Sequence, residues 1–223
     1  MSIAETWLIA RKDLLIEWRS RVMVNQLAPL GLLILVLFAF ATNADVERLQ
    51  EFAPGLFWIA VLLTAMMAIQ RTFSLEAADD VVLGLRMSGL VQAAIFLGKS
   101  LAIMLELLVL EFILGVGIII FYGVQIPEPG LAVASLLVAS AALATSGTIY
   151  GALSLGIRVR ETLLPLLFIP VAAPVLLGAT RALESATGVS TAGGWSWVGL
   201  VGAIALLYGS LGVMLFGSVL EES

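Results

Sequence analysis

The chain has 223 residues, of which 61% are hydrophobic and 12% are charged, and its formal net charge is −5. It contains no cysteine and no histidine, which excludes disulfides, thiol redox chemistry, and zinc or haem iron held by either residue type. Neither GxxxxGKS nor GxxxxGKT occurs, so nucleotide hydrolysis by a P-loop mechanism is excluded as well.

The segment Ser2–Arg21 is predicted to form an amphipathic helix. Its apolar residues at helical spacing share one arc, and charged residues lie opposite them. The arc contains Ile3, Trp7, Ala10, Leu14 and Trp18, and the opposite side contains Glu5, Lys12 and Arg19. Asp13 and Glu17 fall near the margin of the arc. We expect a helix in the plane of the membrane interface that sets topology; an elbow helix that also meets a cytoplasmic partner is the alternative.

Six apolar stretches follow, each about long enough to cross a bilayer, which takes roughly 20 helical residues. Helices are predicted because lipid offers no partner to an unpaired backbone amide, and because Leu30–Phe40 is apolar on every face. The predicted spans are Val22–Thr42, Pro54–Ile69, Leu97–Tyr122, Leu131–Ile157, Thr162–Thr180 and Trp195–Val219. The predicted fold class is an all-α integral membrane protein with one domain over 1–223, whose second span is the shortest.

The basic residues predict the orientation, because Lys and Arg in short loops favour the cytoplasmic side. With six spans, the two termini share a side with every basic residue except Arg48 and Arg181. We therefore expect both termini to be cytoplasmic and the protein to lie in a bacterial cytoplasmic (inner) membrane.

The connection 70–98 is the longest on the predicted cytoplasmic side. Ser74 is placed to cap a helix, and the acidic residues that follow would favour its N-terminal half. We expect Thr72–Leu90 to be an amphipathic coupling helix against which a motor subunit pushes; a solvated end of a helical hairpin is the alternative. The residues assigned to ATPase coupling are Arg71, Leu75, Glu76, Asp79, Asp80, Val82 and Leu85.

Two acidic residues, Glu106 and Glu111, lie inside the third predicted span, where an ionisable group indicates function by default. Five residues of helix separate them by about 140°, so they are not expected to form one carboxylate pair. Each could join an interhelical hydrogen-bond network, or could line a transport path or a subunit seam.

The fourth and fifth spans contain residues that shape helix packing. Gly147 and Gly151 predict a close helix approach. Pro165, Pro170 and Pro174 each remove an amide donor, so the fifth span is expected to be kinked or interrupted.

Two stretches resemble the heme exporter protein B family. The first is Ala53–Leu63 (APGLFWIAVLL), followed by Arg71 and Phe73, and the second is the proline-rich Leu163–Leu176. The chain departs from the family pattern at Gln70, where relatives tend to have Glu, and within the connection that follows. The resemblance implies a type-2 ABC exporter-like permease of bacterial cytochrome c maturation.

The resemblance also implies partners: an ABC ATPase subunit, a second copy of this chain, a haem-handling membrane protein and a small accessory subunit. Haem would be the handled ligand, ATP would act through the partner, and the chain itself would bind no cofactor, catalyse nothing and contact lipid but no nucleic acid. Tyr122, Tyr150, Tyr208 and the methionines are the weaker candidates for haem ligands.

Three other functions stay open at this stage. The chain could be an ABC permease for another lipid-like or amphipathic substrate. It could be a proton-coupled carrier that uses Glu106 and Glu111, or a membrane scaffold that transports nothing.

Overall fold

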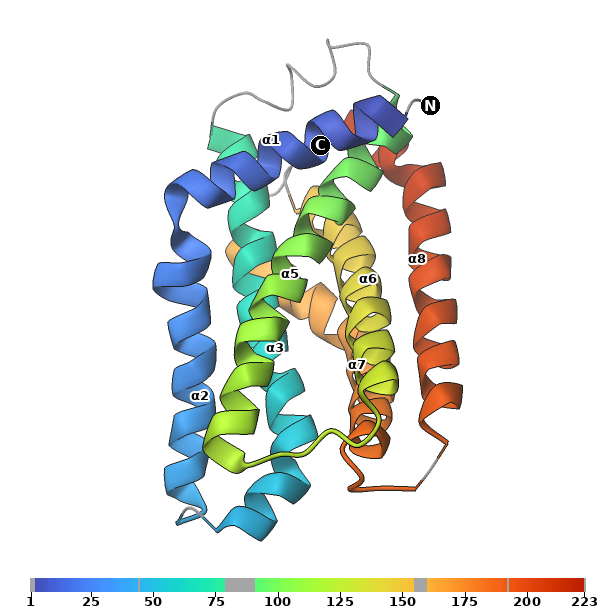
Figure 1. Ribbon diagram of the computed structural model, residues 1–223. Helices are drawn as coiled ribbons and strands as arrows, with labels where there is room; N and C mark the ends of the chain where they lie inside the picture. Colours follow the sequence, from blue (N-terminus) through green and yellow to red (C-terminus); the bar gives the residue numbers. More distant parts are fainter. Residues whose placement is uncertain (1–2, 44, 79–90, 155–159, 192, 223) are drawn as a thin grey trace.

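The computed structural model describes residues 3–43, 45–78, 91–154, 160–191 and 193–222, and these are helical apart from short connections. The helices are α1 (Ile3–Ser20), the π-helix η1 (Met23–Leu27), α2 (Ala28–Ala41), α3 (Val46–Ala78), α5 (Gln92–Tyr122), α6 (Pro129–Leu153), α7 (Arg160–Ala186) and α8 (Gly194–Glu222). Figure 1 shows a bundle of long helices with α1 lying across one end.

Six of the described helices are long and apolar enough to cross a membrane. They cover Met23–Ala41, Val46–Ser74, Gln92–Tyr122, Pro129–Leu153, Leu164–Ala186 and Gly194–Gly217. The predicted all-α fold with six spans is therefore confirmed, and the protein is a multi-pass membrane protein. The start of α1 and the end of α8 lie at the same end of the bundle, as an even number of spans requires (Figure 1). We call this end the α1 end.

The prediction that the second span begins at Pro54 and is the shortest was wrong. That proline lies inside α3, which begins at Val46 and has 33 residues. The polar first turns stay helical because the core holds them: Leu49 and Ala53 are fully buried, at 1% and 0% exposed. The Asp45 carboxylate accepts a hydrogen bond from the Arg48 amide at 3.4 Å, which satisfies one free donor at the helix start.

Arg21 turns the chain from α1 into the first span. Its φ of 54° lies in the left-handed region, a common way for a helix to end. The Arg21 amide and the Ser20 hydroxyl both donate to the Glu17 carbonyl, at 3.1 and 2.8 Å. The last turn of α1 is thus closed before η1 begins.

Small residues let α6 approach α3 closely, as the sequence predicted. A Cβ atom added at Gly147 would lie 3.1 Å from Ile69 Cγ1, and one added at Gly151 would lie 3.0 Å from Phe73 Cγ. Both distances are shorter than the 3.4 Å at which ordinary van der Waals contact begins. A side chain at either glycine would therefore force the facing Ile69 or Phe73 side chain, or the helix itself, to shift.

The fifth span is one continuous helix, α7, with Pro165, Pro170 and Pro174 inside it. The expected interruption is absent from the described residues 160–186. A kink at these prolines stays a prediction.

Candidate functional site at the α1 end

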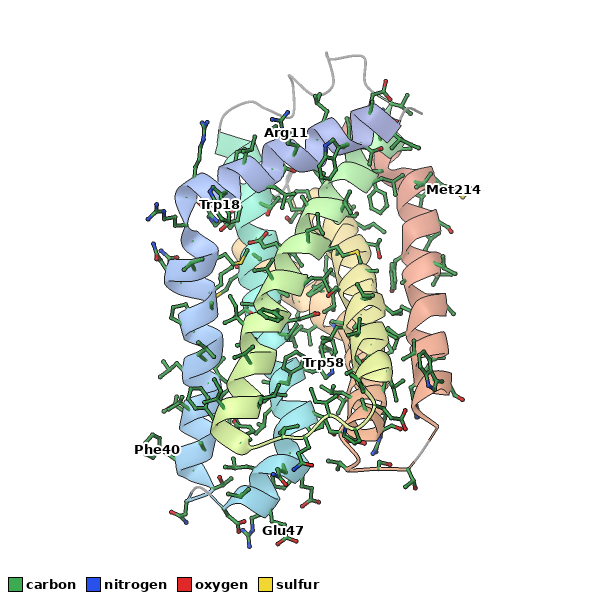
Figure 2. All side chains as sticks on the ribbon, in the orientation of Figure 1. Arg11, Trp18, Phe40, Glu47, Trp58 and Met214 are labelled. Carbon is green, nitrogen blue, oxygen red and sulfur yellow. The ribbon has the colours of Figure 1, made fainter. Side chains whose placement is uncertain are left out.

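The side of α1 that faces the bundle is not its apolar arc. Ile9 and Ala10 are the buried residues of α1, at 3% and 0% exposed, while Ile3 and Trp7 remain 87% and 53% exposed. Arg11 and Trp18, both labelled in Figure 2, are exposed as well. Of the predicted arc, only Ala10 is buried. The helix therefore docks on the bundle with a face that borders the arc and contains Asp13 and Glu17.

Glu17 connects three parts of the chain. One carboxylate oxygen, Oε2, forms an ion pair with the Arg71 guanidinium near the end of α3. The other oxygen, Oε1, accepts a hydrogen bond of 2.8 Å from the amide of Met23, the first residue of η1. A single carboxylate thus joins α1, the end of α3 and the start of the first span.

Asp13 forms the second connection, to α5. Its Oδ2 lies 3.3 Å from Lys99 Nζ, and its Oδ1 lies 2.9 Å from Lys12 Nζ. Lys99 is only 1% exposed, and its ammonium also lies 5.5 Å from the centre of the Phe73 ring. A buried cation needs such partners, because leaving water without them is costly.

Close packing holds α1 and α5 together beside these ion pairs. A Cβ atom at Gly98 would lie 2.7 Å from Ile9 Cβ and 2.8 Å from the Thr6 carbonyl oxygen. Only a glycine fits at this crossing of α1 over α5, and it is the residue next to Lys99.

Glu106 belongs to the same group of charges. Its side chain is 7% exposed, and it is within electrostatic reach of Glu17, Arg71 and Asp13. We name the five residues Asp13, Glu17, Arg71, Lys99 and Glu106 the α1 charge cluster. It gathers three acidic and two basic side chains from three helices in a mostly buried setting.

Glu111 lies apart from this cluster. It is 0% exposed, and its Oε1 accepts a hydrogen bond of 2.7 Å from the Ser140 hydroxyl of α6. Its Oε2 has no hydrogen-bond partner within the described part of the chain. The two acidic residues of α5 thus have different surroundings, in keeping with their predicted angular separation.

Most of the residues assigned to ATPase coupling cannot be placed. Asp79, Asp80, Val82 and Leu85 lie outside the described residues, and Leu75 and Glu76 lie in the last turns of α3 without described side chains. Arg71 is described, and it is engaged by Glu17.

The predicted helix start at Ser74 was wrong. The Ser74 hydroxyl donates to the Gln70 carbonyl at 2.6 Å, inside α3, rather than capping a new helix. The helix continues through this serine, because a hydroxyl can bond the carbonyl four residues earlier without ending a helix.

One of the three tyrosines bonds the backbone of another span. Tyr122 is 1% exposed, and its hydroxyl donates to the Leu35 carbonyl of α2 at 2.7 Å. Tyr150 of α6 and Tyr208 of α8 are electrostatic neighbours. Among the described residues, no group of three or more acidic, His or Cys side chains could hold a metal ion.

Six spans of nearly pure helix, with a further helix held by ion pairs to the ends of two of them, define a multi-pass membrane protein. The family model for "CcmB protein" matches residues 4–221. The chain therefore belongs to the CcmB protein family, which agrees with the resemblance noted in its sequence.

Curated relatives carry one name over most of this length. "Heme exporter protein B" of Pseudomonas aeruginosa is 28% identical over 207 residues, which cover 92% of each chain. The protein of the same name from Haemophilus influenzae is 29% identical over 186 residues, 80% of each chain. That from Escherichia coli K12 is 25% identical over 181 residues, which are 81% of this chain and 82% of the relative.

Proposed function

We propose that this chain is the permease subunit of an ABC-type haem exporter that serves cytochrome c biogenesis in a bacterial cytoplasmic membrane. The observation that carries the proposal is the family match over residues 4–221. The relatives' printed name and the six spans support the same function. We further propose that the α1 end faces the cytoplasm, because nine of the eleven basic residues lie on that side in a six-span arrangement.

ATP hydrolysis would belong to a separate subunit, since this chain has no P-loop sequence. As a type-2 ABC exporter-like permease, it would form a homodimer over two ATPase subunits. A haem-handling membrane protein and a small accessory subunit would complete the assembly. The proposed docking segment is Thr72–Leu90, because its sequence combines acidic residues with apolar anchors of the kind that enter a groove.

Within this assembly the chain would supply motion rather than the axial ligand of haem iron. It has no His or Cys, and the Tyr122 hydroxyl is committed to a backbone carbonyl. A histidine-bearing partner would therefore hold the iron, while the spans of this chain move around or beside the haem.

Co-purification tests the proposal. The chain is extracted in mild detergent from cells that express the whole complex, and the proteins that remain bound are identified. We expect an ATPase and a haem-handling membrane protein to co-elute with the wild-type chain, and deletion of the gene to abolish holo-cytochromes c. Recovery of the chain alone, with normal holo-cytochromes c in the deletion strain, would contradict the proposed function.

A pair of double variants locates the ATPase contact. Val82→Asp with Leu85→Asp should release the ATPase and leave membrane insertion intact. The matched control places the same two changes on the exposed side of α1, at Leu8 and Leu15, which are 62% and 44% exposed. If the α1 variant releases the ATPase and the first variant does not, the contact lies on α1 instead.

A proton-coupled carrier is the second candidate, favoured by the two buried carboxyl groups of α5. Glu111 Oε2 has no hydrogen-bond partner among the described residues, so this oxygen is available to take up a proton. This function would survive removal of any ATPase and would stop when the proton gradient is collapsed. Glu106→Gln and Glu111→Gln should then each abolish transport. An ATP-driven permease should instead keep transport in at least one of these two single variants.

A further inference from the structure

The two ion pairs of α1 are made with residues on either side of the segment 79–90. Arg71 lies near the end of α3, and Lys99 is the eighth residue of α5. Glu17 binds the first and Asp13 binds the second. Two carboxylates one helical turn apart on α1 thus hold both flanks of this segment.

We infer that Asp13 and Glu17 are positioning residues, which fasten both flanks of the segment 79–90 to α1 and through it to the first span. The consequence for transport rests on the proposed function, in which the ATPase acts on this segment. The fastening itself depends only on the contacts of the described residues.

The contacts of Glu17 link the end of α3 to the start of the first span. Because its two oxygens bind Arg71 and the Met23 amide, a displacement of the end of α3 would be passed to the first turn of η1. The first span begins at this turn and continues into α2. Along the backbone, Arg71 and Met23 are separated by an entire hairpin of two spans. Through space, the Glu17 side chain contacts both residues directly.

The contacts of Asp13 join α1 to α5. Lys99 is buried, so its ammonium cannot exchange Asp13 freely for water. The contact of Gly98 with Thr6 and Ile9 leaves no gap between the two helices. We therefore expect α1 and the start of α5 to move as one body, with Glu17 passing that movement to the end of α3 and to the first span.

Hydrogen–deuterium exchange of the isolated chain in lipid nanodiscs tests the fastening. Glu17→Ala, which removes the acceptor, should speed exchange of the Met23–Leu27 amides about tenfold, the scale expected for loss of a hydrogen bond to a charged group. Glu47→Ala is the matched control, because Glu47 is exposed and lies at the opposite end of the bundle (Figure 2). Equal exchange in the two variants would overturn the inference.

A charge exchange in the whole complex tests the consequence. Glu17→Gln should still co-purify with the ATPase, but the holo-cytochrome c formed per assembled complex should fall below the wild-type amount. Glu17→Arg combined with Arg71→Glu should recover the part of the loss that is due to the ion pair and so exceed Glu17→Arg alone, but it should stay below wild type because arginine cannot accept the Met23 amide. A purely structural role would instead lower the amount of complex and leave the output of each complex unchanged.

In this second experiment, two results would overturn the inference: full output from Glu17→Gln, or an assembled charge-exchange variant no better than Glu17→Arg alone. If the wild-type chain binds no ATPase at all, the proposed function fails. The exchange measurement on the isolated chain still decides whether Glu17 positions the first span.

Discussion

Substituting Gly98 by alanine is expected to loosen α1 from α5. The new methyl group would lie 2.7 Å from Ile9 Cβ and 2.8 Å from the Thr6 carbonyl oxygen. The second neighbour is backbone, so no side-chain rotation relieves the contact. The helix α1 would have to move away from the bundle, and this would lengthen the ion pair between Asp13 and Lys99.

The matched control is Gly115→Ala in the same helix, where an added Cβ meets no atom within 4 Å. Both substitutions gain roughly 0.5–1 kcal/mol because alanine loses less conformational entropy than glycine in a helix. At Gly98 this gain is opposed by an overpacking cost of roughly 1–3 kcal/mol. We therefore expect Gly115→Ala to be neutral or stabilising, and Gly98→Ala to be destabilised by about 1–2 kcal/mol.

Thermal unfolding in detergent, followed by tryptophan fluorescence, measures the difference in stability. Thiol labelling reports the movement of α1 directly, because the natural chain has no cysteine and Ile9→Cys would place a thiol at a site only 3% exposed. Labelling should be slow in an otherwise unchanged chain, unaffected by Gly115→Ala and faster with Gly98→Ala. Equal melting temperatures and equal labelling rates for the two alanine variants would refute the reasoning.

Three further outcomes are expected. Ser140→Ala removes the only described hydrogen bond to Glu111 and should lower the free energy of unfolding by about 1–2 kcal/mol. The control Thr145→Ala removes a hydroxyl that bonds its own helix and should cost less, so equal losses would contradict this. Tyr122→Phe should destabilise the chain by about 1 kcal/mol, because it removes a buried hydrogen bond that joins α5 to α2, and an unchanged melting temperature would show that the bond contributes nothing. The isolated chain should purify without stoichiometric haem, and a Soret band retained by the partner-free protein would overturn that expectation.

The sequence alone was sufficient for the class of protein and for most of the spans. Apolar runs of about 20 residues can only be spanning helices, because backbone polar groups in lipid must bond within their own segment. The separate surroundings of Glu106 and Glu111 also followed from the sequence, since helix geometry over five residues is local. The family was identifiable from the stretch Ala53–Leu63, whose unusual order of Pro, Gly and Trp is itself local.

The edges of α3 could not be predicted in the same way. A proline and a serine looked like its boundaries, but the helix runs through both Pro54 and Ser74. Its first turns are held by burial of Leu49 and Ala53 against other helices, and that support is not visible in a local pattern. Helix boundaries therefore depended on packing, which overrode the usual signals for a start or a stop.

The charge cluster was decided by the tertiary structure alone. In the sequence, Asp13 and Glu17 interrupt the margin of an amphipathic pattern. Their role could not be predicted from it, because their partners are 86 and 54 residues away along the chain. Only the folding of three helices at one end of the bundle shows that these carboxylates face Lys99 and Arg71. A helix in contact with lipid, water and protein must present three faces, and the hydrophobic periodicity of its sequence distinguishes only an apolar face from a polar one. The third face is defined by the neighbouring helices, so it appears only when they are in place.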